Sequence, residues 1–463
     1  MKTVFYFTLI FVFFLTSCSK EKIITSPDAT ISFSSDTLYF DTVFTTIGSV
    51  TSSVKILNDN ERKLLLSSIR LAGGNSSPFK INIDGVSASE ANDIAIRAND
   101  SMYMFVQVTI NPDNQQLPFI IEDSIEVRFN GNTKWLQLRA YGQNAIFLRN
   151  QIIDTDTHWT DSLPYVLLGS LTIRHGATLY LDPGTRIYTH ADAPILVNGT
   201  LHSEGTEETP VTFSGDRTDA DYKNLPASWP GIYLTDSSEN TFIRHTIIQN
   251  AYQAIVLQGI PDNSNPKLTI SQSIIRNIYD AGILALNSSI VADNCLIINC
   301  GSNITLLMGG DYSFTHCTVA SYGSLYITHK NPVLAATDYF EEGGTLYTAG
   351  LSAQFTNCIF WGDNGNVDNE IVLVKKGSGQ FDAVYNNCLY KAKETVTNAV
   401  FTNSILNEPP MFDSINTSKN FYDFRFTKTS NAPAINAGIV TAYPFDLEGK
   451  ARDSQPDIGC YEK

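Results

Sequence analysis

Three strings of five residues follow one another at a constant spacing of 22 positions: SIIRN at 273–277, CLIIN at 295–299 and CTVAS at 317–321. TIIQN at 246–250 precedes them, and CIFWG at 358–362 and CLY at 388–390 follow them. The segments 261–266 and 329–349 interrupt the period and are expected to be loops inserted at corners. A period of this length indicates a repeat architecture in which each unit stacks on its neighbours.

Short strands that pair in parallel between successive units satisfy this repeat, and the resulting geometry is a right-handed parallel β-helix. Successive coils then lie about 4.8 Å apart, and equivalent residues stack in columns. The sequence predicts one inward column of small side chains and one of larger apolar side chains. The small column is Thr246, Ser273, Cys295, Cys317, Cys358 and Cys388, and the apolar column is Ile248, Ile275, Ile297, Val319, Phe360 and Tyr390. A third column, Asn250, Asn277 and Asn299, is expected to hydrogen-bond its side-chain amides along the axis.

The chain before the repeats has a different pattern. Residues 31–145 contain short alternating runs separated by turn signals such as NGN at 130–132, which is typical of an all-β sandwich. The segment resembles the immunoglobulin-like modules that precede surface domains in exported lipoproteins, without the cysteines of their disulfide. The expected fold class is therefore all-β: an immunoglobulin-like β-sandwich over 31–145, followed by a right-handed parallel β-helix solenoid over 146–405.

The end of the chain carries the most specific resemblance. The strings DFRF at 423–426, NAPAINAG at 431–438, DLEGKAR at 446–452 and PDIGCYE at 456–462 occur in this order. They resemble the closing segment of bacterial secreted and surface β-helix proteins of the pectate-lyase-like class. Because a solenoid needs a terminal cap over its last open coil, residues 406–463 are expected to form the C-terminal cap. The roles of such proteins are diverse, so the resemblance constrains the fold far more than the chemistry.

The N-terminus is typical of an exported lipoprotein. Residues 4–15 form an unbroken apolar run, which is too short to span roughly 30 Å of hydrocarbon but suits a secretory signal. LTSC at 15–18 resembles the lipobox at which bacterial lipoprotein signals are cut. The resemblance implies a signal peptide over 1–17 and lipidation of Cys18. The alternative is a plain secretory signal with an incidental cysteine.

Residues 18–30 are expected to form the lipidated tether. A lipidated cysteine anchors a chain without a transmembrane helix, so the membrane is expected to be contacted through the lipid alone. By analogy with lipoprotein sorting, Ser19 after the cysteine favours the outer membrane. The periplasmic and external faces of that membrane both stay open, because Lys20-Glu21-Lys22 is a poor match to the acidic signal for surface display.

Composition and charge narrow the classes of partner. The chain has 463 residues and a net charge of −16, which disfavours nucleic acid because phosphate binding needs clustered Lys and Arg. Its 21 Tyr and 26 Phe residues favour β structure. The expected partner is a polysaccharide or another cell-surface macromolecule, and the chain is expected to be a monomer.

Six cysteines remain when Cys18 is set aside. Four of them fall in the small inward column, where stacked side chains point the same way and form disulfides poorly. They are expected to be buried free thiols, with Cys295–Cys300 as the alternative pair. The sequence has no CxxC spacing, which argues against zinc.

The richest polar cluster is GDRTDADYK at 215–223, which is followed by SWPG at 228–231. Its carboxylates, Asp216, Asp219 and Asp221, have the oxygen ligands that Ca²⁺ prefers, and calcium is the one cofactor that the sequence suggests. Trp229 can stack on a sugar ring, and the same cluster supplies further candidates for ligand binding, namely Asp216, Arg217, Asp219 and Asp221. The alternative is a solvated corner loop in which Arg217 and Lys223 neutralise the acids.

His245 and His316 form a second candidate for ligand binding. Each immediately precedes a residue of the small inward column, so both should point outward on the same side of the solenoid. Asn294, Asn357 and Asn387 occupy the same offset. Such a stripe is either ordinary surface polarity or the place where a glycan lies.

Three functions remain open at this point. The first is non-catalytic binding of glycan or another macromolecule by a membrane-anchored lipoprotein. The second is a polysaccharide lyase or glycoside hydrolase, which needs acid and base groups in one cleft. The sequence has no Asp-Asp pair, which the polygalacturonase type of β-helix enzyme uses, and it identifies no catalytic residue. The third is an adhesin or structural spacer.

Overall fold

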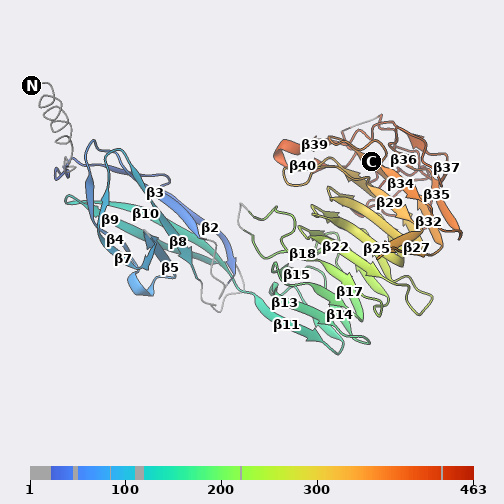
Figure 1. The fold of residues 1–463 in the computed structure, drawn as a ribbon, viewed down its shortest axis with the longest axis horizontal. Helices are drawn as coiled ribbons and strands as arrows, with labels where there is room; N and C mark the ends of the chain where they lie inside the picture. Colours follow the sequence, from blue (N-terminus) through green and yellow to red (C-terminus); the bar gives the residue numbers. More distant parts are fainter. Residues whose placement is uncertain (1–21, 45–50, 84, 110–118, 219–221, 429–430) are drawn as a thin grey trace, which may run out of the picture. The chain divides into compact units, whose positions relative to one another are not determined.

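Figure 1 shows the chain as a computed structural model, which describes residues 22–44, 51–83, 85–109, 119–218, 222–428 and 431–463. Cys18, Asp219 and Asp221 lie outside these residues. Contacts divide the chain into two units, Met1–Asn144 and Ala145–Lys463. The described residues form strands and two short 3₁₀ turns, Gly74–Ser76 and Thr417–Lys419, and none of their helices is long and apolar enough to cross a membrane.

The first unit consists of two five-stranded sheets whose neighbouring strands are antiparallel, except for the parallel pair β2 and β10. One sheet has the order β1 (Ile31–Phe33), β3 (Ser52–Asn58), β8 (Ser101–Val108), β5 (Phe79–Ile83) and β6 (Val86–Ala88). The other has the order β2 (Thr37–Phe44), β10 (Asn132–Gln143), β9 (Phe119–Phe129), β4 (Leu64–Leu71) and β7 (Glu90–Ile96). Both sheets contribute to one core, for example through Ile56 and Val106 from the first sheet and Leu66 and Val127 from the second.

The second unit contains a sheet of 26 strands, in which each strand pairs in parallel with strands further along the chain. The pairings arrange the strands in three stacks, and successive strands along the chain belong to the first, second and third stack in turn. Four long strands each belong to two stacks: β11 (Ile146–Ile153) and β13 (Tyr165–Ile173) to the second and third, and β25 (Ala281–Asp293) and β27 (Ser302–Thr315) to the third and first.

The remaining strands of the sheet each belong to one stack. The first stack adds β12 (Thr157–Trp159), β14 (Thr178–Leu181), β17 (Thr200–Glu204), β20 (Thr241–Arg244), β23 (Leu268–Ser271), β32 (Leu351–Thr356), β35 (Phe381–Asn386) and β37 (Val400–Thr402). The second stack adds β15 (Arg186–Thr189), β18 (Val211–Gly215), β21 (Thr246–Gln249), β24 (Ile274–Arg276), β26 (Leu296–Ile298), β28 (Thr318–Ser321), β33 (Ile359–Gly362), β36 (Leu389–Tyr390) and β38 (Ile405–Leu406). The third stack adds β16 (Ile195–Val197), β19 (Ile232–Leu234), β22 (Gln253–Gln258), β29 (Leu334–Thr337) and β34 (Ile371–Val374).

Side chains that alternate along each strand separate a core between the stacks from an outer face. The predicted apolar column pairs in register through the second stack, for example Ile275 with Ile297 and Val319 with Phe360, and both pairs are buried. The cysteines of the predicted small column are also buried, and none of the six described cysteines forms a disulfide. This confirms the expected free thiols and leaves Cys295 and Cys300 unpaired.

Asparagines at one corner of the stacks have left-handed backbone conformations, with φ of 64° at Asn250, 55° at Asn277 and 49° at Asn299. Asparagine tolerates this conformation better than most residues. The Asn277 side-chain amide donates to Asn250 Oδ1 at 2.7 Å, which confirms the predicted contact for this pair. Asn299 differs, because its Oδ1 accepts from the backbone N–H of Tyr322.

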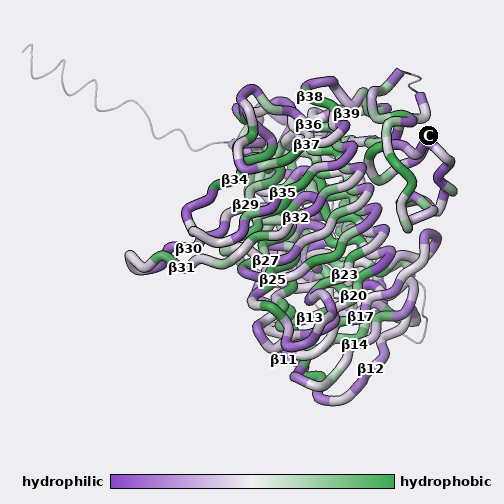
Figure 2. Tube along the Cα trace, turned by 90° about the vertical axis from the view of Figure 1, so that its right-hand side faces the viewer, coloured by the Kyte–Doolittle hydropathy of each residue, from purple (hydrophilic) through white to green (hydrophobic). Residues whose placement is uncertain are grey.

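One expectation needs correction. The segment 329–349 is more than a corner loop, because it contains the antiparallel hairpin β30 (Tyr339–Glu342) and β31 (Thr345–Thr348), which projects from the stacked strands in Figure 2. Apolar residues of the segment 406–463 pack with outer residues of the second stack, and the cap expected there stays a prediction. Phe401, which precedes this segment, covers the end of the core by stacking on Tyr385 and Tyr390 at 4.6 and 4.2 Å between ring centroids.

Candidate functional site

The C-terminal segment, residues 421–463, packs against the outer face of the second stack. It begins with β40 (Phe421–Asp423), which pairs with β39 (Ser414–Asn416). The outer positions of the later strands in the stack are apolar, and they form a second core with apolar residues of the segment. This core includes Leu296, Ile298, Ile359, Trp361 and Leu389 from the strands, and Phe424, Phe426, Leu447, Ile458 and Tyr461 from the segment. The need to bury these outer side chains explains why the segment lies along the side of the stack.

Arg452 fixes the segment to the stack from a buried position. Its guanidinium donates to Asn294 Oδ1 at 2.7 Å, to the Gly459 carbonyl at 2.9 Å and to Glu462 Oε2 at 3.1 Å. Its side chain is 3% exposed and that of Glu462 is 5% exposed. Removal of one partner from a buried pair of this kind typically costs about 3–5 kcal/mol.

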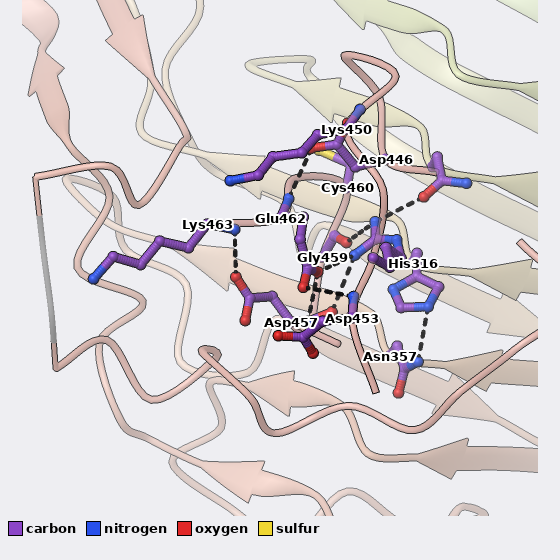
Figure 3. A network of polar contacts seen from close by, with 12 residues as sticks. His316, Asn357, Asp446, Lys450, Asp453, Asp457, Gly459, Cys460, Glu462 and Lys463 are labelled. Carbon is purple, nitrogen blue, oxygen red and sulfur yellow. Dashed lines mark hydrogen bonds and ion pairs between the residues drawn. The ribbon is translucent and has the colours of Figure 1, made fainter. Parts of the chain in front are cut away.

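Asp446 shapes the loop that faces the earlier strands. Its carboxylate accepts hydrogen bonds from the backbone N–H groups of Glu448, Lys450 and Glu462 at 2.8–2.9 Å, and Figure 3 shows it beside Lys450 and Cys460. The backbone carbonyl of Asp446 accepts from the Gln272 side chain at 2.7 Å. The loop that carries Glu448 is therefore held from both sides.

A cavity of about 270 Å³ lies where this loop meets the second stack. The corner turns before β18, β21 and β24 contribute Thr206, Glu207, His245 and Gln272, the C-terminal segment contributes Glu448 and Tyr461, and apolar atoms come from Ile247, Ile274 and Leu447. The Glu207 carboxylate lies against the loop, because a Cβ placed at Gly449 would come within 2.6 Å of Glu207 Oε2. Gly449 also has a φ of +70°, which glycine adopts without strain.

The environment shifts two titratable groups of the cavity in opposite directions. Burial raises the pKa of Glu448 above its ordinary value. Burial, followed by the positive charge of Arg244, lowers the pKa of the His245 imidazole below its ordinary value. The cavity therefore combines carboxylates, an imidazole that favours its neutral form and the Gln272 amide with an apolar wall. Such a set can hydrogen-bond the hydroxyl groups of a ligand and contact its apolar face.

The predicted cluster at 215–223 lies elsewhere, at the end of β18. His190 Nδ1 is 2.7 Å from Asp216 Oδ2, and burial raises the pKa of the Asp216 carboxyl in spite of this contact. The Arg217 guanidinium lies 3.5 Å from the centre of the Tyr222 ring. Because Asp219 and Asp221 lie outside the described residues, the calcium site at Asp216, Asp219 and Asp221 stays a prediction. The described residues contain no group of three or more His, Cys, Asp or Glu side chains placed to hold a metal.

Trp229 does not have the exposed position that stacking on a sugar requires. It is 1% exposed, and its indole N–H donates to the Gln249 carbonyl at 2.9 Å. The ring lies in the core beside Phe213, with 6.4 Å between centroids. Trp229 follows the loop and enters the core because it is large and apolar, and it satisfies its one donor on the backbone.

The two candidate histidines have separate environments. His245 lines the cavity, whereas His316 is fully buried, so His316 is not free to bind a ligand on that side of the stacks. Figure 3 shows why: His316 lies beside Gly459 and Asn357, beneath the C-terminal segment. His316 Nε2 is 3.0 Å from the Asn357 amide nitrogen, and burial lowers the pKa of His316 from 6.5 to about 3.

The sequence analysis did not find Glu207, Gln272, Glu448 or Tyr461. One signal was available: Gln272 precedes Ser273 of the small column, which is the offset that singled out His245 and His316. It also has a similar backbone conformation, with φ of 43° against 44° at His245. Glu448 and Tyr461 fall in the recognised C-terminal strings, but no local pattern places these strings against residues 206–274.

No family model matches the chain, and no curated protein matches it. Among solved structures, the chain has a similarity to a family 123 glycoside hydrolase from Clostridium perfringens, described for glycolipid glycan hydrolysis. The identity is 13%, the TM-score is 0.20, and the match covers 28% of this chain and 31% of that one. The chain thus spans less than a third of that structure's length.

We predict that His316 makes the protein less stable in acid. The folded protein protonates His316 only near pH 3, whereas the unfolded chain protonates it near pH 6.5. The unfolded state therefore binds more protons between these values, and His316 costs up to about 1.4 kcal/mol of stability for each pH unit of acidification. In urea unfolding between pH 7 and pH 4, H316Q should lose stability less steeply than the unmodified protein. H175Q, which removes an exposed imidazole, is the matched control, and equal slopes for H316Q and the unmodified protein would contradict the prediction.

Proposed function

We propose that the chain is an exported lipoprotein whose second unit binds a glycan without cleaving it. The proposal rests on the cavity between the C-terminal segment and the second stack. The cavity is concave and small, and its lining combines hydrogen-bonding side chains with the apolar side chains of Ile247, Ile274 and Leu447. A sugar ring has the matching surface, with hydroxyl groups at its edge and an apolar face, and pockets of this kind are the usual sites for small ligands.

The charge of the site favours a neutral glycan. Glu207 and Glu448 both line the cavity, and the chain has a net charge of −16. A uronic acid would place a third carboxylate beside these two, which costs free energy through like-charge repulsion. A neutral sugar donates its hydroxyl protons to the carboxylates in charge-assisted hydrogen bonds.

For the fold, we propose that the three stacks form a right-handed parallel β-helix and that the first unit is an immunoglobulin-like sandwich. Successive strands belong to the three stacks in a fixed order, and equivalent strands pair in parallel. Both observations support the first assignment. The two mainly antiparallel sheets around one core support the second. A crystal structure in which the second unit winds with the opposite hand would contradict the β-helix assignment.

We predict that E448Q weakens binding to a neutral polysaccharide about tenfold or more. The amide accepts weaker hydrogen bonds from hydroxyl groups than the carboxylate does. Affinity electrophoresis in gels that contain xylan, β-glucan, galactomannan or dextran measures the effect, with Ca²⁺ and with EDTA. E342Q, on the exposed strand β30, is the matched control. Equal retardation of E448Q and the unmodified protein would refute the cavity as the site, and loss of retardation in EDTA alone would support the predicted calcium.

The same assay separates the alternatives. Glycoside hydrolysis is favoured by one observation, namely that burial raises the pKa of Glu448 beside a second carboxylate, as a general acid and its partner require. New reducing ends without absorbance at 235 nm would establish a hydrolase. New reducing ends together with an unsaturated product that absorbs at 235 nm, tested on a uronic acid polymer, would establish a lyase. Absence of both retardation and cleavage with all polysaccharides would favour an adhesin or spacer.

We predict that Cys18 carries the lipid anchor at the outer membrane. The apolar run that precedes it suits export and is too short to span a bilayer, and a lipidated cysteine anchors a chain in its place. Metabolic labelling with a palmitate analogue should label the unmodified protein, and C18S should be unlabelled and released from the outer-membrane fraction. Labelling of C18S would contradict the assignment, and protease treatment of whole cells distinguishes the external face from the periplasmic face.

A further inference from the structure

Four ring side chains form a continuous row on the outer face of the first stack. His158, Tyr180, His202 and Phe242 occupy paired positions on β12, β14, β17 and β20. Their centroids are 4.5, 5.3 and 5.0 Å apart in this order. We call these four residues the ring row. His158, Tyr180 and His202 are spaced by 22 positions, so the repeat that predicts the stacks also places the row.

A row of charged side chains runs beside the ring row. Glu204 and Arg244 lie two positions after His202 and Phe242 on the same strands, and residues two apart on a strand share one face. Asp182 lies two positions after Tyr180, directly after the end of β14. Glu204 accepts from Arg244 at 2.8 Å and lies 3.1 Å from His202 Nε2. Asp182 lies 3.4 Å from His158 Nδ1. These contacts hold the imidazole rings in one orientation.

The charged row is accessible, the ring row is half-buried except at His158, and both rows are limited in length. The side chains of His158, Asp182, Glu204 and Arg244 are 42–62% exposed. After Phe242 the outer position of the stack changes to Thr269 and then Val291, so the rings stop after four strands. The charged row ends at Arg244, and the next residue, His245, lines the cavity. The rows and the cavity therefore adjoin.

We propose that the ring row and the charged row bind an extended neutral polysaccharide that lies across the four strands. This inference rests on the proposed glycan function and adds the form of the ligand, a polymer in place of a single sugar. Parallel strands repeat about every 4.8 Å, which is close to the advance of one residue in an extended polysaccharide. Consecutive sugars can then meet equivalent groups: an aromatic edge, the Tyr180 hydroxyl or an imidazole nitrogen, and a carboxylate or guanidinium.

The test is the dependence of affinity on the length of the sugar chain. Titration calorimetry with xylo- and cello-oligosaccharides of two and six residues should show that the affinity for the six-residue chain is about tenfold or more above that for the two-residue chain. The double variant Y180T/H202T should lose this gain and still bind the two-residue sugar. Tyr180 and His202 are half-buried, and threonine suits half-buried strand positions, so the fold should persist. Y347T, on the exposed strand β31, is the matched control for loss of a surface tyrosine.

The outcomes separate this inference from the function on which it rests. If E448Q lowers the affinity for oligosaccharides of both lengths, and Y180T/H202T lowers only the affinity for the longer one, the ring row extends the binding site of the cavity. If the unmodified protein binds oligosaccharides of both lengths with equal affinity, or if Y180T/H202T keeps the higher affinity for the six-residue sugar, the inference is wrong and the glycan function stands. If neither length binds the unmodified protein and the polysaccharide gels show no retardation, both proposals are wrong.

Discussion

Burial of the outer face of the second stack beneath the C-terminal segment determines the site of this protein. A strand in a stack buries only its inner side chains, and the outer Ile359 and Trp361 would otherwise meet water. The segment covers them with Phe424, Phe426 and Ile458. The same contact brings residue 448 to residues 207 and 245, so the hydrophobic effect that fixes the segment also creates the cavity.

The polar groups beneath the segment set its register. Arg452 and Glu462 are buried together, and a buried ion pair contributes little net stability when compared with apolar residues of the same size. Its value here is geometric, because Arg452 reaches Asn294 on the strand side and Gly459 on the segment side. Apolar contacts alone would let the C-terminal segment shift along the second stack. These directed hydrogen bonds select one position for the loop that carries Glu448.

Periodic features of the fold could be predicted from the sequence, and features set by long-range contacts could not. The 22-residue step placed Ile275, Ile297 and Val319 in one buried column, because stacking in register needs only local regularity. In the first unit the step is absent, and the alternating pattern over 31–145 did not predict which strands pair, such as the parallel pair of β2 and β10. The burial of His316 was missed because it depends on Gly459, far along the chain. The burial of Trp229 was missed because the polar loop before it indicated a surface position, although the ring packs beside nearby Phe213. Glu207 and Glu448 line the same cavity although they are more than 200 positions apart in the sequence, and no local sequence pattern predicts such a contact.

Hydrogen–deuterium exchange of the full chain tests the central claim most directly. The amides of Gly438, Leu447, Gly459 and Cys460 donate to Pro456, Cys460, Asn357 and Thr318 respectively. If the segment is packed on the second stack, these amides should exchange as slowly as those of the strands beneath them. Exchange as fast as at Gly343 and Gly344, in the exposed turn of the β30–β31 hairpin, would show that the segment does not cover the stack and would remove the basis for the cavity.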